Sequence, residues 1–149
     1  MSKDANKEIC KIININEDAC NFYKAAQMET KDLTVMDIFK KYEETHGEVV
    51  TELQSYVRQN GGEPEADPTI AGMVQQVWGE VKAKISNDVD ESLIASLEEA
   101  EDRCIHSIKD AIKDDNIPAE ARVVLKKQEA TLQKAHDYMK IMKDNVKAA

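Results

Sequence analysis

The sequence is poor in the residues that break helices. It has only five glycines and three prolines among 149 residues. An all-β fold needs many tight turns, which depend on these two residue types, so their scarcity argues against that class and favours long helices. A chain of this length also buries a core without disulfide or metal staples. We therefore expect a single all-α domain spanning residues 1–149.

Cysteine is also sparse. Cys10, Cys20 and Cys104 are an odd number and contain no CxxC pair. This pattern argues against a disulfide framework and against a cysteine-based zinc motif. Reduced and mostly buried thiols are typical of cytoplasmic proteins, so we expect a cytoplasmic location.

Long apolar runs and an excess of basic residues are missing as well. Charges and asparagines interrupt the N-terminal segment, residues 1–18, so it fits neither a signal peptide nor a membrane span. Lysine and arginine total 20 against 29 acidic residues, a net charge of −9. Phosphate contacts need clustered basic residues, so we expect no nucleic acid and no membrane as partner. A glycine-rich phosphate loop, a nucleophile elbow and a catalytic triad are also absent, which argues against a conventional hydrolase, kinase or dehydrogenase.

Apolar residues recur through most of the chain at the three-and-four spacing of amphipathic helices. We expect four long helices, over residues 7–29, 34–60, 90–113 and 117–149. A shorter helix is expected over residues 67–86, where Asp67-Pro68 provides a start signal. The two short connections predict antiparallel helix pairs, and the long connection between the pairs can cross the molecule. The predicted fold class is an antiparallel four-helix bundle with a short extra helix in its long crossover.

Three polar residues fall on stripes that otherwise carry core residues. In the second expected helix, the stripe from Met36 and Phe39 reaches Glu43 and His46. In the third long helix, Glu101 occupies a core-facing position. A buried carboxylate without a partner costs several kcal/mol. We therefore expect these residues to meet a cation, a polar partner or water.

In two antiparallel helices, residues about equally far from the connecting turn lie side by side. Counting from the two turns therefore adds further polar residues at the same height along the bundle. The predicted layer contains Glu17, Glu43, His46, Glu101, Gln133 and His136. Di-metal sites in four-helix bundles take a Glu from each of two helices and Glu-x-x-His from each of the other two. Gln133 stands where the last Glu is needed, and glutamine is a neutral and weaker ligand.

Three interpretations of this layer stay open. It holds Fe, Mn or Zn; or it is a polar or water-filled layer without metal; or the six residues share no layer. A Glu-x-x-His pair arises readily by chance in a helical chain with 29 acidic residues. His136 lies at the edge of its stripe, where a hydrogen bond to a carboxylate across the bundle serves equally well.

Local motifs occur in a fixed order between residues 9 and 145. They are Glu17-Asp18, Phe22–Ala26, Glu52–Gln54, Gly61–Glu65, Gly72 with Trp78, Leu97-Glu98 with Glu101-Asp102, and Gln128 with Ala135–Asp137. In these motifs the chain resembles an uncharacterised bacterial ferritin-like four-helix-bundle family, known only as a domain of unknown function. The resemblance implies a ferritin-like bundle and no known activity. The family pattern shares Glu17, Glu101, Gln128 and His136 with this chain, and usually lacks Glu43 and His46.

Two functions are consistent with these features. The first is a non-enzymatic structural, interaction or stress-associated bundle that self-associates as a homo-oligomer, with its polar layer fixing the register of the helices. The alternative is a metal-binding protein of the di-iron, di-manganese or zinc type, with oxidase or metal-handling activity. We favour the first. No residue is assigned a catalytic or cofactor-binding role, and the cofactor is left open, with Fe, Mn or Zn as the candidates.

Overall fold

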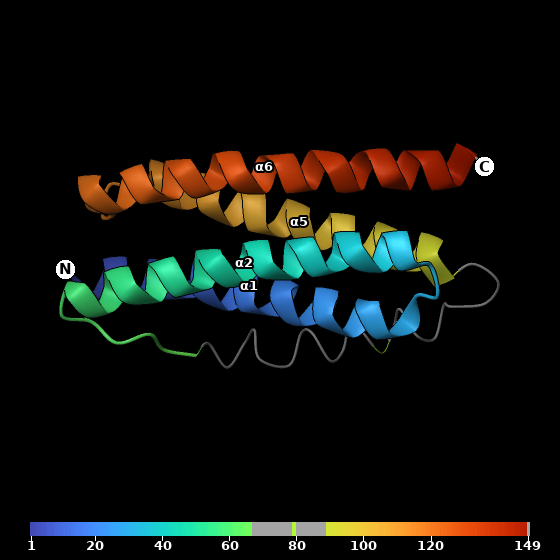
Figure 1. Ribbon diagram of the computed structural model, residues 1–149. Coiled ribbons are helices and arrows are strands. Elements are labelled where there is room, and N and C mark those ends of the chain that lie inside the picture. The colour runs from blue at the N-terminus through green and yellow to red at the C-terminus, as the bar shows by residue number, and fades with distance from the viewer. Residues whose placement is uncertain (67–78, 80–88, 149) are drawn as a thin grey trace.

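The computed structural model describes residues 1–66, 79 and 89–148. These residues form four long α-helices and no strand: α1 (Lys3–Glu29), α2 (Leu33–Gln59), α5 (Val89–Lys113) and α6 (Ala119–Ala148) (Figure 1). The prediction of an all-α fold is therefore confirmed. The short helix predicted over residues 67–86 falls, apart from Gly79, outside the described residues.

The ends of the helices follow from local capping. α1 begins at Lys3 rather than near residue 7, because the Ser2 hydroxyl accepts a hydrogen bond from the backbone N–H of Ala5 at 3.1 Å. Asp32 caps α2 in the same way through two backbone N–H groups. At the other end of α2, Gly61 has a φ of 81°, a left-handed conformation that favours glycine and turns the chain out of the helix.

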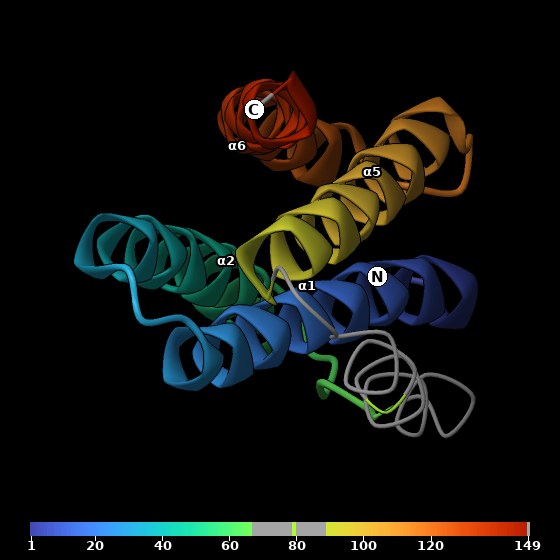
Figure 2. The same ribbon diagram turned by 90° about the vertical axis from the view of Figure 1, so that its right-hand side faces the viewer.

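The helices pack as two pairs. α1 lies along α2 and α5 along α6, while α1 against α5 joins the pairs and α2 contacts α6 only thinly. Figure 1 shows the members of each pair running in opposite directions, and the end-on view in Figure 2 shows α5 between α6 and the α1–α2 pair. Among the described helices, the α1–α2 and α5–α6 interfaces are therefore the most extensive, and the α1–α5 interface connects the two pairs.

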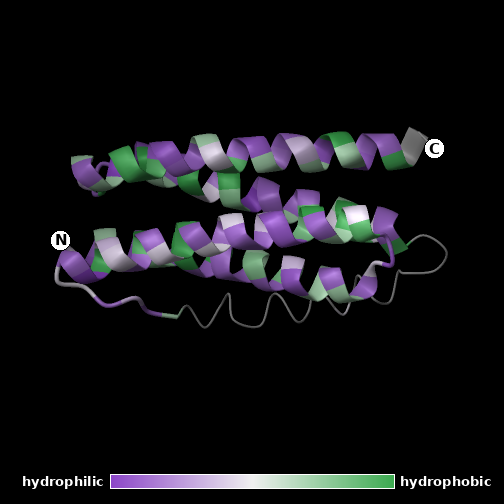
Figure 3. Cartoon of the chain, in the orientation of Figure 1, coloured by the Kyte–Doolittle hydropathy of each residue, from purple (hydrophilic) through white to green (hydrophobic). Residues whose placement is uncertain are grey.

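The core consists of two apolar clusters. One surrounds Ile9, Leu53 and Ile108, and the other surrounds Phe39 and Leu97. Figure 3 shows hydrophobic and hydrophilic residues alternating along all four helices, as amphipathic packing requires. Within the described part of the chain, no helix has the length and apolar character needed to cross a membrane.

Candidate functional site

Polar side chains from three helices are completely buried at mid-length of the molecule. Asn16 of α1, His46 of α2 and Glu101 of α5 are each 0% exposed. Along their helices they lie between residues of the two apolar clusters, and Tyr23, also 0% exposed, lies beside them. We call these four side chains the buried network.

Short hydrogen bonds join all four members. His46 Nδ1 is 2.7 Å from Asn16 Oδ1, and His46 Nε2 is 2.6 Å from Glu101 Oε1. The Tyr23 hydroxyl donates to the same Glu101 oxygen at 2.6 Å. The Tyr23 ring also stacks on the imidazole, with centroids 5.8 Å apart and planes 26° apart. The imidazole is therefore held at both nitrogens and on one face.

The network fixes the tautomer of His46. Asn16 Nδ2 donates to the carbonyl oxygen of Ile12 at 2.9 Å, so Asn16 turns its acceptor oxygen toward the imidazole. His46 Nδ1 must therefore carry a hydrogen. At the other nitrogen, a separation of 2.6 Å requires one hydrogen between Nε2 and Glu101 Oε1. Both ring nitrogens are thus engaged by protein groups, and His46 keeps no free nitrogen.

Neighbouring ionisable groups stay neutral. Burial, reinforced by the charge of Glu101 and their hydrogen bond, raises the pKa of Tyr23 well above its usual value of 10.0. Burial and the same carboxylate raise the pKa of Cys104 well above 9.0. Tyr23 is therefore a hydrogen-bond donor at all physiological pH values, and Cys104 is an unreactive thiol.

Three buried polar side chains of the described residues are incompletely satisfied. Asn6 Oδ1, Glu101 Oε2 and both amide atoms of Gln128 have no hydrogen-bond partner among those residues. Gln128 belongs to α6 and is only 3% exposed. An unsatisfied buried polar atom costs about 1–3 kcal/mol. Each of these atoms can accept or donate a further hydrogen bond.

The structure brings only two of the six predicted layer residues, His46 and Glu101, into contact. Glu17 accepts a hydrogen bond from Gln54 at 3.2 Å, and Glu43 accepts one from Gln27 at 2.5 Å. Both of these carboxylates are partly buried between α1 and α2, outside the network. Glu17 and Glu43 therefore do not join His46 and Glu101 in one hydrogen-bonded layer.

On the other side, Gln133 and His136 also lie outside the network. Gln133 donates to Asp137 at 2.9 Å in an exposed position. The His136 side chain, 15% exposed, lies 3.3–3.5 Å from carboxylate oxygens of Glu98, Asp102 and Asp137. His136 therefore joins α5 to α6 near the surface.

Two members of the network were not predicted as site residues. Asn16 occupies a core-facing position of α1, and its polar side chain among isoleucines was a usable signal. Tyr23 looks like an ordinary core aromatic in the sequence, so nothing marked its hydroxyl as a partner for Glu101.

Across the described residues, no three or more His, Cys, Asp and Glu side chains are arranged to hold a metal ion. Metal binding by the six predicted residues stays a prediction.

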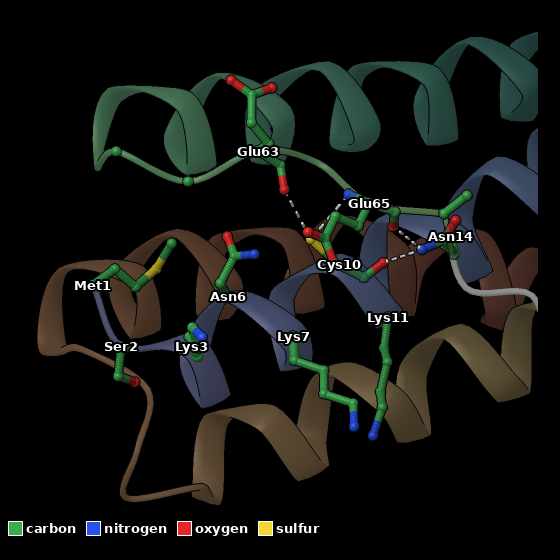
Figure 4. A pocket seen from close by; sticks show the side chains of 13 residues that line it. Met1, Ser2, Lys3, Asn6, Lys7, Cys10, Lys11, Asn14, Glu63 and Glu65 are labelled. Atoms are coloured by element: carbon green, nitrogen blue, oxygen red, sulfur yellow. Dashed lines mark hydrogen bonds between the residues drawn. The ribbon is translucent and has the colours of Figure 1, made fainter.

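A pocket of about 730 Å³ lies apart from the network, beside the N-terminal half of α1 (Figure 4). One of its walls is the segment 61–66, which hydrogen bonds hold against α1. Asn14 Nδ2 donates to the carbonyl oxygen of Glu65 at 2.9 Å, and Cys10 Sγ lies 3.5 Å from the Glu65 backbone nitrogen. Gly62 permits this close approach, since a Cβ there would lie 2.4 Å from Asn6 Oδ1.

Comparison with known proteins gives a family for the chain. The profile of a family described as a domain of unknown function (DUF2383) matches residues 4–114. The chain belongs to this family. The match covers nearly all of α1 and the whole of α2 and α5, the helices that supply the buried network of this DUF2383 member, and it ends before α6. No curated protein and no solved structure matches the chain.

Proposed function

We propose that this chain is a ferritin-like antiparallel four-helix bundle located in the cytoplasm. Its function in this proposal is non-enzymatic: it is a structural, interaction or stress-associated protein. In this proposal the buried network is a device for specificity. It makes α1, α2 and α5 meet in one register, because any other register buries a carboxylate and an imidazole without partners.

The observation that carries this proposal is the closed hydrogen bonding of His46. Both ring nitrogens are occupied by protein groups, at 2.7 and 2.6 Å, and the side chain is 0% exposed. A catalytic or ligand-binding imidazole needs a nitrogen that reaches substrate or metal. This imidazole reaches neither without first breaking one of its two buried hydrogen bonds.

A second candidate function is metal binding, with oxidase or metal-handling activity. The observation that favours it is Glu101 Oε2, a buried carboxylate oxygen with no partner among the described residues. The residues around it do not form a ligand set as they are placed, because His46 is fully engaged and Glu43 and His136 face other neighbours. Fe, Mn or Zn binding would therefore require the network to rearrange.

Metal analysis separates the two functions. The chain is purified without chelator, and its Fe, Mn and Zn are measured alongside the Glu101→Gln variant and the control variant Glu99→Gln, which alters an exposed residue of the same helix. The structural proposal predicts less than about one tenth of a metal per chain in all three, and no change in melting after Zn²⁺ or Fe²⁺ is added. A stoichiometric metal that Glu101→Gln loses and Glu99→Gln keeps would overturn it.

A further inference from the structure

Three of the four tyrosines form a continuous row of rings that leads from the surface into the core. The ring of Tyr138 on α6 lies 6.0 Å from the ring of Tyr42 on α2, measured between centroids. The ring of Tyr42 lies 5.9 Å from the ring of Tyr23 on α1. Aromatic pairs in contact have centroids roughly 4.5–7 Å apart, so each ring is a direct neighbour of the next. We call these three residues the tyrosine row.

Exposure to solvent falls along the tyrosine row. Tyr138 is 43% exposed, Tyr42 is 6% exposed and Tyr23 is 0% exposed. The outer ring is open to molecules in solution, whereas the inner ring is closed to them. The row therefore connects the solution with a ring that no solute touches.

The inner end of the row has a base for the phenol proton. The Tyr23 hydroxyl donates to Glu101 Oε1 at 2.6 Å, within the range that direct proton transfer requires. A phenol that loses one electron becomes a strong acid, and a positive charge left on its buried ring would be costly. Transfer of the proton to Glu101 moves this charge from the ring to the hydrogen-bonded pair of Glu101 and His46.

The charges beside the row differ between its middle and its inner end. Lys41 Nζ lies over the face of the Tyr42 ring, 5.6 Å from its centroid. A positive charge at this place opposes the loss of an electron from Tyr42, whereas the carboxylate of Glu101 favours the loss of an electron from Tyr23. Oxidation of the row is therefore more favourable at Tyr23 than at Tyr42.

We propose that the tyrosine row is a one-electron relay through which this chain reduces a one-electron oxidant in solution. The oxidant gains an electron from Tyr138, Tyr138 regains one from Tyr42, and Tyr42 regains one from Tyr23. The O–H bond of Tyr23 breaks, its proton forms an O–H bond at Glu101 Oε1, and the ring becomes a neutral phenoxyl radical. The net change is one electron transferred from Tyr23 to the oxidant, with the proton kept inside the protein.

This activity goes beyond the proposed structural function and does not depend on it. The relay needs only the three rings and the Glu101 carboxylate. Two exposed tyrosyl radicals on different molecules can couple with each other, but a radical on Tyr23 is shielded because its side chain is 0% exposed. The radical on Tyr23 should therefore live longer than a radical on an exposed tyrosine.

Flash oxidation of the full chain tests the relay. Photogenerated tris(bipyridine)ruthenium(III) is the oxidant, and electron paramagnetic resonance detects the tyrosyl radical. The native chain should give a long-lived tyrosyl radical that forms more slowly in D₂O, because an O–H bond breaks. Tyr23→Phe should lose the long-lived signal, and Tyr138→Phe should slow its formation, since phenylalanine is much harder to oxidise.

Tyr56→Phe is the matched control. Tyr56 is a partly buried tyrosine of α2, and among the described residues no ring contact joins it to the row. This variant should therefore keep the native yield and rate. Glu101→Gln keeps the shape of the side chain but removes the base, so it should lower the radical yield. Circular dichroism checks the helix content of each variant, and Tyr23→Phe and Tyr138→Phe decide the test if Glu101→Gln does not fold.

Three results would overturn the relay or one of its parts. An equal long-lived signal in Tyr23→Phe and the native chain would overturn Tyr23 as the end point. Equal rates of formation in Tyr138→Phe and Tyr56→Phe would overturn the route through Tyr138. Absence of a long-lived tyrosyl radical in the native chain would overturn the relay as a whole, whereas metal content and core stability test the proposed function separately.

Discussion

Replacing His46 by leucine tests the buried network most sharply, because leucine has a similar volume and leaves only a small cavity. The substitution removes the bonds of 2.7 and 2.6 Å to Asn16 and Glu101. Glu101 then keeps Tyr23 as its sole hydrogen-bond partner among the described residues, while remaining 0% exposed. Removing one partner of a buried charged pair costs about 3–5 kcal/mol.

We therefore expect His46→Leu to lower the free energy of unfolding by about 4 kcal/mol, a large part of the 5–15 kcal/mol typical of a domain. The corresponding fall in Tm is about 10 °C for a chain of this size. Urea unfolding followed by circular dichroism measures the free energy, with the slope m as a check on two-state behaviour.

His106→Leu is the control for this measurement. The His106 side chain is 71% exposed on α5, so its replacement should change stability by no more than about 0.5 kcal/mol. Tyr23→Phe gives an intermediate case, about 1–2 kcal/mol, since it removes one bond to Glu101 and leaves the imidazole in place. A loss below about 1 kcal/mol for His46→Leu would refute the view that the network is a closed unit.

Three further predictions concern other parts of the chain. Burial raises the pKa of Asp18 from 3.8 to about 6, so ionisation of this carboxyl group opposes folding as the pH rises through that range. Asp18→Asn should therefore be more stable than the native chain above pH 6, by about 1 kcal/mol, because solvent screens this half-exposed group. Near pH 4 the two proteins should have equal free energies of unfolding in denaturant titrations. Gly47→Ala should raise stability by up to about 1 kcal/mol, because a Cβ there would meet nothing closer than Cys20 Sγ at 4.0 Å, whereas Gly62→Ala should lower stability through its contact with Asn6. Cys104, whose pKa burial raises, should resist iodoacetamide in the native state and react after unfolding, as peptide mass spectrometry would show; labelling at the native-state rate of an exposed thiol would contradict its placement in the core.

The sequence predicts the helices well, because long amphipathic periodicity needs no tertiary information. It also places His46 and Glu101 inside, since both lie in phase with core residues of their helices. The N-terminal end of α1 was predicted too late because the cap is formed by Ser2, ahead of the apolar pattern. Helix ends depend on such single side chains more than on periodicity.

Only two of the six residues expected in one layer, His46 and Glu101, come into contact, and the reason is geometric. Distance from a turn gives the level of a residue along a helix, but it does not give the direction of its side chain around the axis. Glu43 precedes His46 by three residues, a rotation of about 60°, and that rotation aims it at α1 instead of the core. His136 follows Ala135, which takes the core position, so the histidine turns to α5.

Tyr23 shows what sequence alone does not supply. Its ring lies on the apolar stripe of α1, as expected. Its hydroxyl, however, donates a hydrogen bond to Glu101 of α5, which is 78 residues away in the sequence. The partner of a buried hydroxyl depends on how the two helix pairs dock, and no pattern within α1 encodes that docking.

The most direct test of the account replaces the whole network by apolar residues, in the variant Asn16→Leu, Tyr23→Phe, His46→Leu and Glu101→Met. Buried ionic groups replaced together by well-packed apolar residues of similar volume are usually neutral or stabilising, because no charge is left unpaired. We predict a free energy of unfolding within about 2 kcal/mol of the native value, although His46→Leu alone costs about 4 kcal/mol. A loss equal to the sum of the single substitutions would contradict the network as a closed structural unit.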